Sequence, residues 1–227
     1  MELASKPPNT FDRPSRRRVL STAAALLLVG RTVVRAEPAA SALSSAAINA
    51  WLMIAPDDTV TIMLAQSEMG QGIATTLPLV LADELGADWP RVKLQWSDFD
   101  PAYRHPQYQW MFTGNSESIA TFFPMMRTIG AAARDMLIRA AAKQFGVAAD
   151  SLRVENGRIH HDATAGSLTF GAVAADAATL EVPKDPTLKP MSALKWIGKP
   201  QPRRDIPSKV DGSAQFGIDV SKSNKRL

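Results

Sequence analysis

The sequence contains no cysteine among its 227 residues. The chain therefore forms no disulfide, thiolate zinc site or iron–sulfur ligation of its own. It also lacks the run of about 20 apolar residues that a membrane-spanning helix needs, so we predict that it is not transmembrane. Hydrophobic residues at 45% and charged residues at 21% are ordinary for a globular protein and exclude a largely disordered chain.

The net charge of +4 is unevenly distributed along the chain. Residues 1–36 carry seven basic and two acidic residues, residues 37–183 carry nine and sixteen, and residues 184–227 carry ten and four. A protein that binds a phosphate backbone needs positive charge on its folded surface, whereas the central body here is acidic. We therefore expect no nucleic-acid partner.

Residues 1–36 have the pattern of a bacterial export signal. Arg16-Arg17 precedes a short apolar run, Ala23–Val29, and the small residue Ala36 ends a plausible cleavage site. Paired arginines are typical of the twin-arginine route, so we predict export to the periplasm. The alternative is a basic N-terminal helix. The Ala/Ser-rich residues 37–50 are predicted to be a linker.

Hydrophobic periodicity predicts an α+β fold for residues 51–182. Strands at 59–65 and 92–96 flank a helix from Ile73 to Leu85, a strand–helix–strand unit that usually makes a parallel pair. Gly86 is suited to end this helix as its C-terminal cap.

A long helix is predicted for residues 116–145, and Pro124 should kink it or mark its true start. Asn156-Gly157 predicts a β-hairpin, and a short helix follows at 169–180 with Thr169 as its N-cap. Six prolines make residues 183–208 an extended crossing segment. The buried stripe of the long helix is expected at Ile119, Phe122, Met126, Ile129, Ala133 and Leu137.

Two glycine-containing loops suit a ligand that carries phosphate. Gln66–Gly72 joins a strand to a helix, where Gly70 and Gly72 permit close approach of the backbone and Gln71 offers an amide donor and acceptor. The free N–H groups at the helix start should favour an anion. Thr113–Ser118 enters the long helix in the same way. The alternatives are an ordinary glycine turn and simple N-capping by Asn115 or Ser116.

Other polar residues are weaker candidates. His160 and His161 are adjacent in a predicted strand, so they face opposite sides and do not share a metal ion. His105 is expected at the surface, and Asp83 and Glu84 are expected to be solvated at a helix end. No carboxylate has a context that argues for a general base.

Gln66–Ile73, which reads Gln-Ser-Glu-Met-Gly-Gln-Gly-Ile, closely resembles a loop of the xanthine dehydrogenase/aldehyde oxidase family. The resemblance is strongest to the molybdopterin-binding large subunit of the isoquinoline 1-oxidoreductase beta-subunit type. Supporting stretches are Leu81–Trp89, Thr113–Ser118, Gly130–Leu137 and Lys209–Asp219. The resemblance implies that residues 51–182 are part of a larger molybdopterin-binding domain and that residues 209–227 are a truncated start of the next domain.

The resemblance also implies a molybdenum–molybdopterin cytosine dinucleotide cofactor. Its expected contacts are Met69, Gly70, Gln71, Gly72, Thr113, Gly114, Ser116 and Ser118, and Asn115 stands where the family pattern usually has a second glycine. The catalytic glutamate of the family has no counterpart here, so we assign no catalytic residue and no metal ligand to the chain.

The function that the resemblance implies is the N-terminal part of a periplasmic molybdenum hydroxylase for aldehydes or N-heterocycles. Its expected partners are the missing C-terminal part of the large subunit and a separate [2Fe-2S] small subunit. The alternatives are a non-catalytic exported α+β binding module and a non-functional gene fragment.

Overall fold

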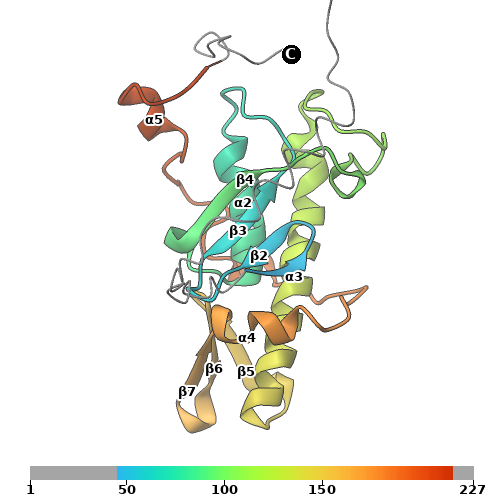
Figure 1. Ribbon diagram of the computed structural model, residues 1–227, viewed down its shortest axis with the longest axis vertical. Coiled ribbons are helices and arrows are strands. Elements are labelled where there is room, and N and C mark those ends of the chain that lie inside the picture. Colours follow the sequence, from blue (N-terminus) through green and yellow to red (C-terminus); the bar gives the residue numbers. More distant parts are fainter. Residues whose placement is uncertain (1–44, 217–227) are drawn as a thin grey trace, which may run out of the picture. The chain divides into compact units, whose positions relative to one another are not determined.

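A computed structural model describes residues 45–216 (Figure 1). The predicted export signal, residues 37–44 of the predicted linker and residues 217–227 lie outside the described part. The described residues form a mixed α+β structure with two small sheets, as the sequence predicts. None of the helices within residues 45–216 has both the length and the apolar character that crossing a membrane requires.

The first sheet has four strands in the order β1-β2-β3-β4. Strands β3 (Val60–Leu64) and β4 (Val92–Trp96) pair in parallel, with Val60 opposite Val92, which confirms the predicted strand–helix–strand unit. Strands β2 (Leu52–Ile54) and β1 (Ala46–Asn49) extend the sheet in antiparallel order. The linker prediction is therefore wrong for residues 46–49. The alanines around it obscure the strand pattern of this segment, but Ile48 is buried in the core.

Helices α2 (Ile73–Leu85) and α3 (Glu117–Phe145) pack closely on one another. A Cβ added to Gly130 of α3 would lie 2.7 Å from the carbonyl oxygen of Leu81 in α2, so only glycine permits this approach. Gly86 ends α2 as predicted, because its N–H donates to the carbonyls of Ala82 and Asp83 at 2.9 and 3.2 Å.

Helix α3 differs from the prediction in two respects. It begins at Glu117, two turns before Pro124, so the proline does not mark its start. Four members of the expected stripe are buried, but Ile119 is exposed and Ile129 is only half-buried. The first turn of α3 extends beyond the core, and Ile119 lines a pocket of about 380 Å³.

The second sheet is an antiparallel set of three strands, β5 (Leu152–Glu155), β6 (Arg158–His161) and β7 (Gly166–Thr169). Figure 1 shows these strands beside the C-terminal half of α3. The predicted hairpin is confirmed, with φ of 48° at Asn156 and 73° at Gly157. Strand β7 was not predicted. The side chain of Thr169 accepts from the N–H of Ala172 and caps α4 (Phe170–Ala177), as expected.

The proline-containing residues 183–205 run in an extended path that includes one 3-10 turn, Met191–Ala193, and lead into α5 (Ile206–Val210). This returning segment covers the end of α2. Asp83 and Glu84, which were expected to be solvated, are therefore only 3% and 0% exposed. That expectation is wrong because the segment that buries them lies about 110 residues further along the chain.

Candidate functional site

The two loops singled out in the sequence meet at one pocket of about 380 Å³. Six of the eight predicted contact residues line it, namely Met69, Gln71, Thr113, Gly114, Ser116 and Ser118. Ile73, Asn115 and Ile119 complete the lining. Gly72 lines a neighbouring pocket of about 360 Å³, which shares Gln71 and Ile119 with the first. The structure thus brings together loops that are more than 40 residues apart in sequence.

Gln66 joins the two loops, a role that the sequence did not reveal. This buried side chain follows β3, donates to the carbonyl of Phe112 at 3.1 Å and accepts from the hydroxyl of Ser118 at 2.9 Å. The hydroxyl of Thr113 also accepts from the N–H of Ser67 at 2.9 Å. Only the structure shows that Gln66 is buried, and a buried amide requires hydrogen-bond partners, which the second loop supplies.

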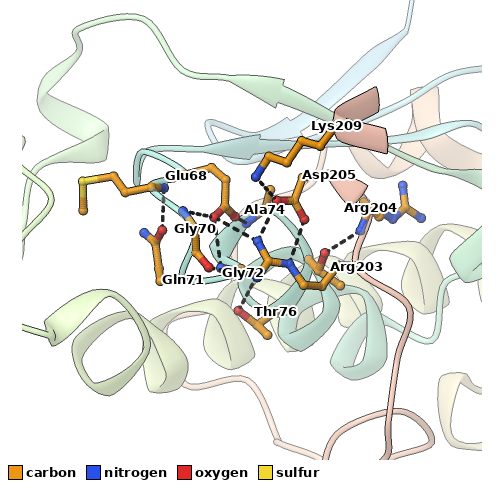
Figure 2. Close-up of polar contacts among 12 residues, drawn as sticks. Glu68, Gly70, Gln71, Gly72, Ala74, Thr76, Arg203, Arg204, Asp205 and Lys209 are labelled. Carbon is orange, nitrogen blue, oxygen red and sulfur yellow. Dashed lines mark hydrogen bonds and ion pairs between the residues drawn. The ribbon is translucent and has the colours of Figure 1, made fainter. Parts of the chain in front are cut away.

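The start of α2 differs from the expected anion site (Figure 2). The carboxylate of Glu68 accepts from the N–H groups of Gly70 at 2.8 Å, Gly72 at 3.0 Å and Ala74 at 3.0 Å. The sequence predicts that free N–H groups at this helix start bind a ligand anion. That prediction is wrong for Ala74, because the carboxylate of Glu68, from the same loop, already accepts from its N–H group.

The electrostatics of Glu68 agree with this arrangement. Its side chain is only 10% exposed, and this burial raises its pKa. The hydrogen bonds from Ala74, Gly72 and Gly70 outweigh the burial and hold the pKa of Glu68 below its ordinary value of 4.5. Glu68 is therefore ionised near neutral pH and stabilises the loop as an anion.

Gly72 and Gln71 also serve the internal structure of the loop. Gly72 has a φ of 84°, a left-handed conformation that favours glycine. An added Cβ would meet no atom closer than Cζ of Arg203 at 3.8 Å, so the backbone conformation and not the space requires glycine here. The amide of Gln71 donates to the carbonyl of Ser67 at 2.7 Å and accepts from the N–H of Met69 at 2.5 Å. A ligand that binds the Gln71 amide must replace these bonds.

The start of α3 is the helix end that faces the pocket. Asn115 and Ser116 are both left-handed, with φ of 53° and 58°, and the N–H of Glu117 donates to the carbonyl of Gly114 at 3.2 Å. Among residues 45–216, no side chain caps this end, so the alternative of capping by Asn115 or Ser116 does not hold. Asparagine tolerates the left-handed region, which explains why it can stand where the family pattern has glycine.

His105 lies beneath the loop that leads into α3 and is 1% exposed, so the expectation of a surface position is wrong. Its Nδ1 accepts from the N–H groups of Gln107 and Tyr108 at 3.2 and 3.4 Å, and its Nε2 lies 3.2 Å from a carboxylate oxygen of Glu117. The rings of His105 and Tyr108 stack with centroids 4.6 Å apart. His105 lies in an irregular loop, where hydrophobic periodicity does not predict burial, and so the sequence did not indicate that aromatic rings cover it.

The remaining histidines follow the prediction. In β6, His161 is buried and His160 is half-buried, on opposite faces of the strand. Within residues 45–216, no group of three or more His, Asp or Glu residues is placed to hold a metal ion.

Large apolar side chains are exposed around the pocket and beyond β4. They are Met69, Trp96, Phe99 and Trp110, each more than half exposed. Another pocket, of about 340 Å³, adjoins Trp96 and is also lined by Gln66, Met111 and Thr113 among others. Large contiguous patches of exposed apolar surface often mark sites of interaction with another protein or a ligand.

The sequence model of the family described as "Molybdopterin cofactor-binding domain" matches residues 13–208. The chain belongs to this family. The match covers every residue that lines the 380 Å³ pocket and the whole returning segment, residues 183–205.

Two curated proteins and one solved structure are similar to this molybdopterin cofactor-binding chain. It is 33% identical to isoquinoline 1-oxidoreductase subunit beta of Brevundimonas diminuta, over 76% of the chain and 26% of the relative. It is 34% identical to a membrane-bound aldehyde dehydrogenase [pyrroloquinoline-quinone] of Gluconacetobacter polyoxogenes, over 75% and 22%. The structure of quinoline 2-oxidoreductase from Pseudomonas putida 86 matches 57% of the chain and 16% of its own, at 21% identity and a TM-score of 0.44. The chain spans about a quarter of the length of these two curated relatives.

Proposed function

We propose that this chain supplies molybdopterin dinucleotide-binding loops to a molybdenum hydroxylase that oxidises aldehydes or N-heterocycles. The observation that carries the proposal is the convergence of loops 66–72 and 113–118 on one pocket of about 380 Å³. Membership of the molybdopterin cofactor-binding family supports the same cofactor. The names of the relatives, an isoquinoline oxidoreductase and an aldehyde dehydrogenase, support the class of substrate.

The chemistry of the pocket fits part of such a cofactor. A volume of this size is in the range of small-ligand sites and receives one portion of a dinucleotide. The start of α3 offers helix N–H groups, and Thr113 and Ser116 offer hydroxyls, which suit a phosphate. Among the described residues, those that line the pocket include neither Lys nor Arg. Binding of an anion there depends on helix and hydroxyl donors.

Met69 and Gln71 would flank a second portion of the cofactor across the pocket. The bound cofactor would supply the redox chemistry of hydroxylation. The residues of this chain would bind and orient it, and its left-handed turn at Asn115 and Ser116 would aim the start of α3 at the anion.

The proposal is tested by the molybdenum and pterin content of the purified, cofactor-loaded protein. Asn115→Val and Ser116→Val place branched side chains at left-handed positions and should lower both contents. Asn115→Gly keeps the left-handed turn and serves as the matched control. We expect a loss of roughly tenfold in affinity, which corresponds to one or two hydrogen bonds of about 1 kcal/mol each. Full occupancy in both valine variants, or no molybdenum in the wild type, would refute the proposal.

The cytosine form of the dinucleotide and the partners are part of the same proposal. We infer a separate [2Fe-2S] small subunit and a further part of the large subunit that covers the exposed side chains of Trp96, Phe99 and Trp110. Nucleotide analysis of the released cofactor tests the first point, and co-purification with both partners tests the second. We also propose twin-arginine export to the periplasm, which rests on Arg16-Arg17 and the apolar run after them.

A further inference from the structure

The loop that lines the pocket is held by a residue of its own, Glu68, and by Arg203 from the C-terminal part of the described chain. Glu68 contacts three backbone N–H groups of the loop and of the first turn of α2. Arg203, in the returning segment, donates from Nη1 to the carbonyl of Gly70 at 2.9 Å. We propose that Glu68 and Arg203 are positioning residues that together set the shape of loop 67–72. This inference rests on the proposed function only for the identity of the ligand.

Arg203 lies between two carboxylates, as Figure 2 shows. Its Nη2 is 3.5 Å from an oxygen of Glu68 and 2.6 Å from an oxygen of Asp205, and its Nε donates to Asp205 at 3.0 Å. Lys209 contacts the same Asp205 oxygen at 2.5 Å. Asp205 fixes the plane of the guanidinium, so that Nη1 is directed at the Gly70 carbonyl.

The segment that carries Arg203 is itself anchored to the body of the domain. The N–H of Arg204 donates to the hydroxyl of Thr75 at 2.8 Å, and its guanidinium donates to the carbonyl of Trp89 at 2.7 Å. The Arg204 guanidinium also lies 3.9 Å above the Trp89 ring. These contacts do not involve the loop. Arg203 therefore approaches the loop from a fixed support and acts as a clamp.

The two residues have complementary roles at the loop. Glu68 accepts hydrogen bonds from N–H groups of the loop, and Arg203 donates a hydrogen bond to the carbonyl of Gly70. Since both glycines of the loop have positive φ, the backbone between them has many conformations available without these bonds. The clamp selects one of them, and in it Met69 and Gln71 line the pocket.

Hydrogen exchange of the 227-residue chain, without cofactor, tests the clamp directly. In Arg203→Met and in Glu68→Ala, we expect the amides of residues 69–74 to exchange about tenfold faster, while the strands of the second sheet keep wild-type rates. Glu68→Gln retains an acceptor and should show a smaller increase. Arg153→Met removes an exposed arginine of the hairpin that is distant from the loop, and it is the matched control.

Two results would overturn the inference. Wild-type exchange of residues 69–74 in Arg203→Met shows that no clamp exists. Equal acceleration throughout the chain shows a general structural role instead of positioning. If Glu68→Ala does not fold, Arg203→Met and Glu68→Gln still decide the question.

A second measurement separates this inference from the proposed function. In the cofactor-loaded protein, Arg203→Met should lower molybdenum and pterin content several-fold, whereas Arg153→Met should not. Faster loop exchange together with full cofactor content contradicts the part of the inference that links the loop to the ligand. Failure of the wild type to bind molybdenum refutes the proposed function alone, because the exchange experiment does not depend on it.

Discussion

Arg127 and Glu84 form an ion pair of 2.9 Å in the interior between α2 and α3. The second oxygen of Glu84 lies 2.8 Å from Nη1 of Arg134 and accepts from the N–H of Lys189 at 2.6 Å. Arg127 and Arg134 also donate to the carbonyls of Lys189 and Thr187 in the returning segment. One buried carboxylate therefore connects both helices to the segment that crosses over them.

Replacing Glu84 with glutamine should lower the free energy of unfolding by roughly 3–5 kcal/mol, because two largely buried guanidinium groups lose their counter-charge. Urea unfolding measures this loss. The matched control is Asp162→Asn, which removes an exposed partner of Arg153 and should cost less than about 1 kcal/mol. A loss in Glu84→Gln as small as that of the control contradicts the role given to Glu84.

The carboxylate of Asp83 should hold the returning segment in place through backbone N–H groups of that segment. Its two oxygens accept from the N–H groups of Lys195, Trp196 and Ile197 at 2.8, 2.7 and 2.9 Å. We expect Asp83→Ala to cost roughly 2–4 kcal/mol, since hydrogen bonds to a charged group are lost and their donors remain partly buried. Asp83→Asn should cost less. Hydrogen exchange at residues 195–197 that stays at the wild-type rate in Asp83→Ala would rule this anchor out.

The stability of the domain should depend on pH through Glu68. The pKa of Glu68 is lower in the folded protein than its ordinary value of 4.5, so its contribution is complete above that value and is lost as pH falls through the folded pKa. Side-chain hydrogen bonds from Arg203 and Lys209 hold the pKa of Asp205 well below its ordinary range as well. Wild-type stability should therefore fall with acidification.

Urea unfolding between about pH 6 and pH 3 measures this dependence, which linkage relates to the difference in bound protons between the two states. In Glu68→Gln the fall with acidification should be smaller, and in Asp162→Asn it should resemble the wild type. If the free energy of unfolding depends on pH in the same way in Glu68→Gln and in the wild type, the prediction is wrong.

The export prediction concerns residues outside the described part. Replacing both Arg16 and Arg17 with lysine should leave a precursor in the cytoplasm, because the twin-arginine route recognises the pair. Arg13→Lys, which changes an arginine upstream of the pair, is the control and should be exported. Cell fractionation measures both variants, and normal periplasmic delivery of the double variant argues against this route.

Local features of the fold could be predicted from the sequence because they depend on neighbouring residues. Asn156-Gly157 specifies its own turn, Thr169 caps the helix that follows it, and Gly86 ends α2 through its left-handed backbone. The parallel pairing of β3 and β4 follows from a short helix between two apolar strands. The two loops that meet at the pocket of about 380 Å³ could also be located, since a glycine pair or a hydroxyl-rich turn before a helix is a local pattern.

Only the tertiary structure decided the state of the charged and polar residues. Asp83 and Glu84 are charged residues of a kind usually found at the surface, and they are buried by a segment about 105–114 residues further along the chain. His105 is buried by the aromatic rings of Tyr108, Phe112 and Phe122, which the folded loop and the start of α3 bring together. Glu68 occupies the place expected for a ligand anion because the turn at Gly70 and Gly72 folds its carboxylate back onto the start of α2. The sequence by itself determined where helices, turns and loops form, because these depend on short-range sterics and hydrogen bonds. Burial and charge pairing depend on which distant segments meet, and that is a property of the packed molecule.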